Sequence, residues 1–110
     1  MTDKFKEREK GFEAKWAHDE ELRFKVTARR DKLLGLWAAA ELGLTGAAAE
    51  DYAKAVAKSA FRKSGDDDML CKLRDDFAAK KISRADSAIG SKMEELLTIA
   101  GRQVLSEAKK

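Results

Sequence analysis

The chain has one histidine, His18, and one cysteine, Cys71, the two residue types whose side chains most readily serve as a base or a thiolate nucleophile near neutral pH. Hydrolytic chemistry needs a nucleophile beside a base, and a metal site needs several ligands, but these two residues stand far apart in the chain. Paired cysteines and a phosphate-binding glycine loop are also missing. The sequence therefore predicts a protein that is not an enzyme and has no cofactor or metal. Because Cys71 lies beside Leu70 and Leu73, we expect it to be buried or half-buried.

A basic cluster between residues 23 and 32 is a candidate binding site. It contains five cations and one acid, which are Arg23, Lys25, Arg29, Arg30, Lys32 and Asp31. One interpretation is a solvated face that is balanced by nearby acids. The other is a docking site for an acidic protein surface or for nucleotide phosphates, with weak ATP or ADP contacts at Arg23, Arg29 and Arg30. Because the net charge is only +3 and no DNA-reading motif is present, we expect no nucleic-acid binding.

Three aromatic residues, Phe5, Phe12 and Trp16, are interleaved with alternating acids and bases in residues 1–18. On a helix their spacing would place them on one narrow stripe. Such a stripe buries too little apolar surface to hold an isolated helix in place. We therefore expect residues 1–18 to be a flexible arm that folds when its rings dock as anchors on a partner. The alternative is a fifth short helix that caps the core.

Residues 19–110 must supply the scaffold for these groups, and their composition favours helices. The chain has no proline, and alanine, leucine, lysine and acidic residues dominate. Apolar residues recur at intervals of three and four in four segments separated by short turns. The segments cover approximately residues 19–42, 46–63, 67–80 and 83–108. The fold class predicted from this pattern is all-α, a four-helix bundle that carries the arm.

The ends of these segments carry recognisable helix signals. Asp19 is the expected N-cap of the first helix, and Gly43 is positioned to end it in a left-handed conformation. Thr45 can cap the second helix, and Ser83 with Asp86 resembles a capping box at the start of the last. The expected inner faces contain Leu22, Val26, Leu33, Leu34, Trp37 and Ala38; Ala49, Tyr52, Ala53, Val56, Ala57, Ala60 and Phe61; Met69, Leu70, Leu73 and Phe77; and Ile89, Met93, Leu96, Leu97, Ala100 and Val104.

The hydropathy of the chain bears on its location. The first residues lack the apolar stretch of a secretory signal, and the longest apolar run, Leu33 to Ala40, is too short to span a bilayer. A single cysteine fits a reducing compartment. We therefore expect a cytoplasmic protein with no direct membrane insertion.

One long segment, Glu7 to Leu44, reads EREKGFEAKWAHDEELRFKVTARRDKLLGLWAAAELGL. It closely resembles the zeta subunit family, the natural inhibitors of the alphaproteobacterial F-type ATP synthase. Weaker features continue downstream in Tyr52-Ala53, in Ser64-Gly65-Asp66 before Leu73-Arg74, and in Lys92 to Leu97. The resemblance thus covers nearly the whole chain.

This resemblance implies a four-helix bundle with an inhibitory N-terminal segment. The implied partner is the catalytic head of the synthase, with its α, β and γ subunits, so the protein would be peripheral to the inner membrane. Residues 2–16 would insert as a helix at the α/β catalytic interface near γ and stop rotation in the hydrolysis direction, while residues 19–32 would aim them. The implied partner-binding residues are Phe5, Phe12, Lys15, Trp16, Glu20, Arg23, Arg29 and Arg30. A purine-nucleotide or anion sensor that uses the basic helix 23–32 is the alternative function.

Overall fold

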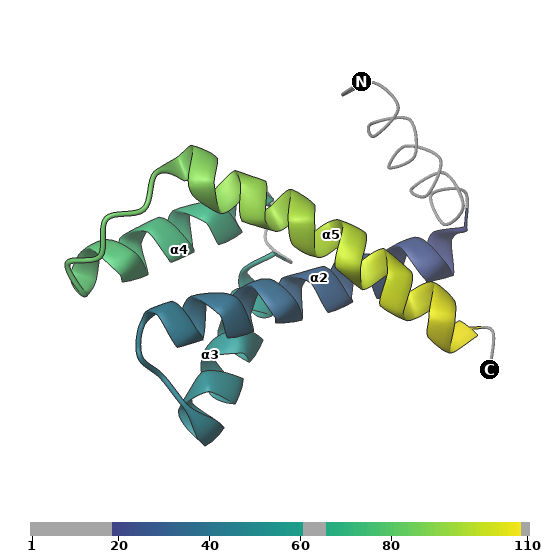
Figure 1. Ribbon diagram of the computed structural model, residues 1–110, viewed down its shortest axis with the longest axis horizontal. Helices are drawn as coiled ribbons and strands as arrows, with labels where there is room; N and C mark the ends of the chain where they lie inside the picture. Colours follow the sequence, from purple (N-terminus) through teal and green to yellow (C-terminus); the bar gives the residue numbers. More distant parts are fainter. Residues whose placement is uncertain (1–18, 61–65, 109–110) are drawn as a thin grey trace.

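The computed structural model describes residues 19–60 and 66–108, which form an all-α fold of four helices (Figure 1). The helices are α2 (Glu20–Glu41), α3 (Gly46–Ser59), α4 (Asp66–Ala79) and α5 (Asp86–Ala108). In the described part of the chain, the predicted fold class and the approximate positions of the four helices are confirmed. The expected arm of residues 1–18 and the expected end of the second helix at residues 61–63 lie outside the described residues.

Helix α2 is the centre of the arrangement, with α3 against its C-terminal half and α5 crossing it in the opposite direction (Figure 1). Helix α4 bridges α3 and α5. Because α2 and α5 run antiparallel, the C-terminal turns of α5 lie beside the first turns of α2. This end of the molecule therefore holds Asp19, the first residue that the structure describes.

The two ends of α2 follow from local chemistry. The side chain of Asp19 accepts a hydrogen bond of 3.0 Å from the backbone N–H of Leu22, as an N-cap does. At the other end Gly43 adopts φ +81°, and the N–H groups of Gly43 and Leu44 donate to the carbonyls of Ala40 and Ala39. These two bonds form a Schellman motif, in which a left-handed residue satisfies the last free carbonyls. Both predicted signals are confirmed.

The other two cap predictions fared differently. Thr45 occupies the N-cap position of α3, but its side chain makes no capping hydrogen bond. The capping box predicted at Ser83 is wrong, because α5 begins three residues later, at Asp86. The physical reason lies at the end of α4, where Lys81 takes φ 60° and Ile82 packs against the core. Residues 83–85 are then needed as an extended connection to the start of α5.

The core consists of two apolar clusters. The larger joins all four helices and contains Leu34, Ala38, Val56, Met69, Leu73, Phe77 and Ile89. The smaller joins α2 to α5 and contains Val26, Ala100 and Val104, with Leu22, Leu33, Leu97 and Leu105 packed against it. Within the larger cluster the rings of Trp37 and Phe77 meet edge to face at 5.8 Å. The smaller cluster anchors the first turns of α2 against α5.

Helices α2 and α3 approach closely at Gly35 and Ala53. A Cβ atom placed on Gly35 would lie only 2.6 Å from the Cα atom of Ala53, which is closer than real Cβ contacts allow. Small residues on both helices are therefore required at this crossing. The small face predicted for the second helix is confirmed at Ala53 and Val56, both buried.

Candidate functional site

Helix α2 carries four of the eight residues predicted to bind a partner, Glu20, Arg23, Arg29 and Arg30. The other four, Phe5, Phe12, Lys15 and Trp16, lie outside the described residues. Glu20 and Arg23 are exposed in the first turns, whereas Arg29 is half-buried and Arg30 is buried. The structure therefore does not bring the four described residues together on one surface.

Arg29 is oriented by α5. Its Nη1 donates to the Oε1 of Gln103 at 2.9 Å, and its Nη2 lies 2.8 Å from both carboxylate oxygens of Glu107. A charge-assisted pair of this kind holds a guanidinium in a defined direction. Arg29 therefore ties the C-terminal turns of α5 to α2, and its charge is offset by Glu107.

Arg30, the next residue of α2, is buried and forms ion pairs with two carboxylates. Its Nε lies 2.9 Å and its Nη2 2.8 Å from Oδ1 of Asp31, and its Nη2 lies 2.8 Å from Oδ1 of Asp66 at the start of α4. The side chains of Arg30 and Asp31 are only 8% and 7% exposed. Buried charges are tolerated when they are paired and hydrogen-bonded, as here.

The pKa values in this cluster follow from burial and charge. Burial raises the pKa of the Asp31 carboxyl, and the attraction and hydrogen bonds of Arg30 oppose this effect without cancelling it. Burial also lowers the pKa of the Arg30 guanidinium, but Asp66 and Asp31 outweigh burial and the net pKa is raised. Arg30 thus stays charged and links α2 to α4, a structural role that the sequence pattern did not indicate.

Phe24 is a surface residue that the sequence interpretation overlooked. Its side chain is 64% exposed, and it is the one large hydrophobic side chain in the described ranges with such exposure. Phe24 lies two positions after Leu22, which on a helix is a rotation of about 200° around the axis. Phe24 therefore faces away from the apolar stripe that contains Leu22. This departure from the apolar period was the signal that could have identified it.

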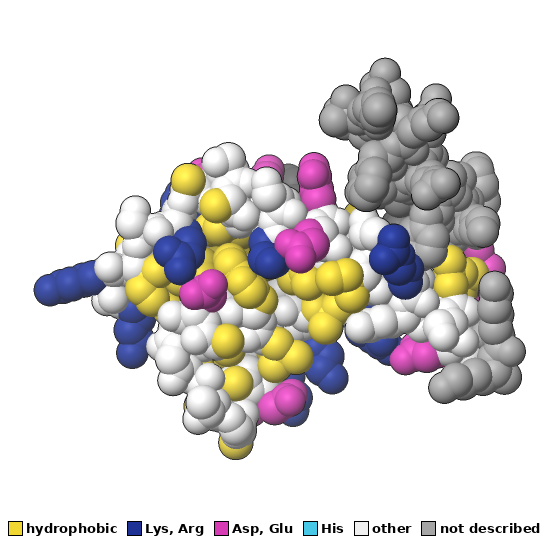
Figure 2. Space-filling view, viewed as in Figure 1, with side chains coloured by type: hydrophobic (Ala, Val, Ile, Leu, Met, Phe, Trp, Pro, Cys, Tyr) yellow, Lys and Arg dark blue, Asp and Glu magenta, His cyan; other side chains and the backbone are white. Residues whose placement is uncertain are grey.

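Phe24 borders a hollow of about 310 Å³ between α2 and the end of α5. The lining residues are Phe24, Lys25, Ala28, Arg29, Lys32, Val104 and Glu107. Lys25 also pairs with Glu21 at 3.2 Å on the exposed side of α2, a contact that contributes little stability in water. Elsewhere, on the face drawn in Figure 2, basic and acidic side chains are intermixed and do not gather in a single patch.

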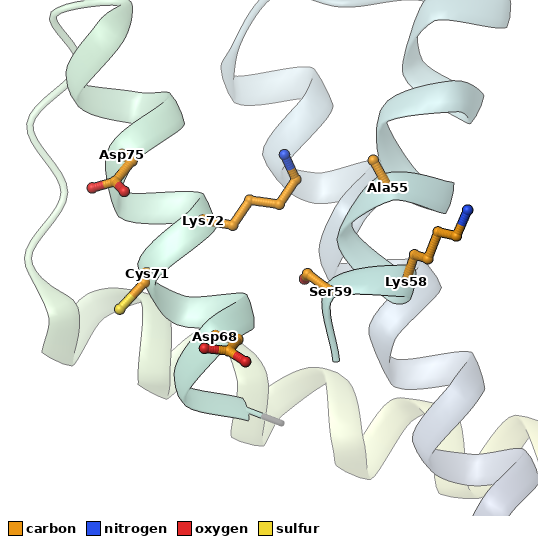
Figure 3. Close-up of a pocket in the computed structure, with 7 residues that line it drawn as sticks. All are labelled: Ala55, Lys58, Ser59, Asp68, Cys71, Lys72 and Asp75. Atoms are coloured by element: carbon orange, nitrogen blue, oxygen red, sulfur yellow. The ribbon is translucent and has the colours of Figure 1, made fainter. Parts of the chain in front are cut away.

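A second hollow, of about 640 Å³, lies between α3 and α4 (Figure 3). Its polar side chains do not converge: Lys72 extends from α4 toward α3, whereas the amine of Lys58 points away from α4. Lys72 is already engaged by Asp76 at 3.1 Å and lies over the ring of Tyr52. This arrangement fastens α3 to α4 and does not form an anion site.

Tyr52 and Asp76 complete this α3–α4 contact. The Tyr52 hydroxyl donates a hydrogen bond of 2.6 Å to Asp76, and its pKa is strongly raised by burial and by that carboxylate. Cys71, which lines the same hollow, is an exposed free thiol. The expectation that it is buried or half-buried is wrong, because on α4 the buried positions are Met69, Leu73 and Phe77, and Cys71 falls between them on the outer side.

Two negative findings apply to the part of the chain that the structure describes. Among residues 19–60 and 66–108, no group of three or more histidine, cysteine or acidic side chains is placed to hold a metal ion. None of the helices in these ranges has the length and apolar character needed to cross a bilayer.

The comparisons with known proteins connect this helical protein with one family. No individual curated protein matches the chain. A family model described as ATPase inhibitor subunit zeta matches residues 1–103, which is nearly the whole chain and includes the segment before α2. The protein thus belongs to the ATPase inhibitor subunit zeta family, and it is a non-enzymatic regulator that acts on ATP synthase.

Proposed function

We propose that this protein blocks ATP hydrolysis by the catalytic head of the F-type ATP synthase through its first residues. Residues 2–16 insert at the α/β catalytic interface near γ and stop rotation, and Phe5, Phe12 and Trp16 are the apolar anchors. The observation that carries the proposal is the family match, which starts at residue 1 and so includes this segment. An aromatic residue that becomes fully buried is the type of side chain that dominates binding free energies.

The geometry of α2 supports a division of roles between the first residues and the helical body. The Asp19 cap fixes the start of α2, and Leu22 and Val26 hold its first turns against α5. A segment inserted into the synthase would therefore be joined directly to a helix that is packed at both of its ends. A helix anchored in this way fits the role of a body that holds the inserted segment against rotation.

The experiment compares the full chain with a variant that lacks residues 2–17, in an ATPase assay with the purified catalytic head. We expect the deletion to abolish inhibition and to leave the thermal unfolding of the helical body nearly unchanged. Two single variants form a matched pair, Phe12→Ala and its control Lys10→Ala. Only Phe12→Ala should weaken inhibition substantially. Undiminished inhibition after the deletion would refute the proposal.

The alternative function, a nucleotide or anion sensor at residues 23–32, would have to use arginines that already have partners. Arg29 is bound by Glu107 and Arg30 by Asp31 and Asp66, so a phosphate would need to displace carboxylates at 2.8 Å. The structure therefore favours the inhibitor over the sensor. An NMR titration with ATP distinguishes them, since a sensor predicts shifts of residues 23–32 at sub-millimolar ligand.

A further inference from the structure

We infer that the hollow beside Phe24 is a second docking surface, which receives an apolar side chain from an acidic segment of the ATP synthase. The inference rests on the proposed function, because it assigns the same partner to a different part of the chain. The Phe24 surface is defined by the residues that line this hollow, Phe24, Lys25, Ala28, Arg29, Lys32, Val104 and Glu107. It lies on both α2 and α5.

The apolar part of the Phe24 surface is unusual for this molecule. Phe24 is 64% exposed, although burial of a phenylalanine side chain is strongly favourable in water. Ala28 follows one turn later and is also exposed, while Val104 forms the floor of the hollow at 4% exposure. A ring beside a shallow hollow with an apolar floor suits an inserted apolar side chain.

The charges around the hollow favour a partner segment that carries carboxylates. Three cations, Lys25, Arg29 and Lys32, line it together with a single carboxylate, Glu107. That carboxylate is held by Arg29 through two contacts of 2.8 Å, so it adds little repulsion toward an approaching acid. Lys25 is likewise paired with Glu21 at 3.2 Å, so the positive charge that remains to steer and orient a carboxylate-bearing segment is that of Lys32.

The position of Phe24 argues for the synthase as the occupant. It lies five positions after Asp19, a rise of about 7.5 Å along a helix. A partner that holds the residues before Asp19 therefore lies within side-chain reach of Phe24. A second copy of this chain is disfavoured, because a two-fold contact through Phe24 would place the same net positive surface on both sides of the interface.

The test measures equilibrium binding of the full chain to the purified catalytic head, with variants that change the Phe24 surface. We expect Phe24→Ala to weaken binding by about tenfold to a hundredfold. Its thermal unfolding should match that of the native chain, because the ring is largely exposed. Lys32→Glu should slow association and reduce its salt dependence, whereas the control Lys54→Glu, on the exposed side of α3, should do neither.

Three outcomes would overturn the inference. If the native chain binds the head and Phe24→Ala binds equally well, the Phe24 surface has no role while the proposed function stands. If Phe24→Ala instead changes the sedimentation of the free chain and not its affinity for the head, the occupant is a second copy. If the native chain does not bind the head at all, the proposed function fails and this inference fails with it.

Discussion

Replacement of Arg30 by methionine should destabilise the fold much more than replacement of its partner Asp31 by asparagine. Methionine fills much of the space of the arginine stem but leaves Asp31, whose side chain is 7% exposed, without its counter-ion. Loss of one partner from a buried pair costs about 3–5 kcal/mol. In Asp31→Asn, Arg30 keeps its ion pair with Asp66 at 2.8 Å. We therefore expect the free energy of unfolding to fall by only about 1–2 kcal/mol.

The pH dependence gives this comparison a second readout. The pKa of Asp31 is already raised in the native fold by burial, which Arg30 opposes, so Arg30→Met must raise it further above the ordinary value of 3.8. A folded-state pKa above the unfolded value means that the folded chain holds a proton that the unfolded chain has released. Stability is then present at low pH and falls as pH rises through this window. The loss in the free energy of unfolding caused by Arg30→Met should therefore be largest at neutral pH and should shrink toward about pH 4.

Urea denaturation followed by far-ultraviolet circular dichroism, at about pH 7 and about pH 4.5, measures both quantities. The double variant Arg30→Met with Asp31→Asn serves as the control, since it removes both charges and should recover part of the stability that Arg30→Met loses. Equal costs for the two single variants, together with a deficit of Arg30→Met that does not change with pH, would refute the assignment of Arg30 as a buried link.

Three further predictions follow from individual contacts. Gly35→Ala should lower the free energy of unfolding by about 1–3 kcal/mol, despite the better helix propensity of alanine, because its Cβ would meet Ala53 at 2.6 Å; a more stable variant in urea would contradict the close crossing. Asp19→Ala should cost about 1 kcal/mol by removing the α2 cap, while Asp19→Asn should restore most of it in the same assay. Tyr52→Phe should cost about 1–3 kcal/mol in thermal unfolding, because it removes the donor to Asp76; an unchanged melting temperature would show that this bond does not hold α3 to α4.

Part of the candidate site was recognisable before the structure. The concentration of cations in residues 23–32 identified a charged segment of α2, and Arg29 does line a surface hollow. The burial and the ion-pair partner of each cation were not recognisable, because neighbouring residues on a helix point in different directions and meet different partners. Glu107 lies 78 positions from Arg29, and Asp66 lies 36 positions from Arg30. No local pattern relates such distant residues.

Local chemistry in the sequence determined the helices and most of their ends. Asp19 caps α2 with a bond to a residue three positions away, and Gly43 ends the helix because glycine takes positive φ without steric cost. Both effects act within one turn and need no tertiary contact. The apolar period likewise identified core residues such as Leu34 and Phe77, since helical geometry alone sets which positions share a face.

Only the tertiary structure decided how the helices cross, and with it the environment of the polar residues. The close approach at Gly35 and the burial of Arg30 both depend on where α3 and α4 meet α2. The hollow beside Phe24 depends in the same way on where the C-terminal turns of α5 pack against α2. Crossing geometry arises from the packing of whole helix faces, summed over many weak contacts, and this sum is not contained in any single segment of the sequence.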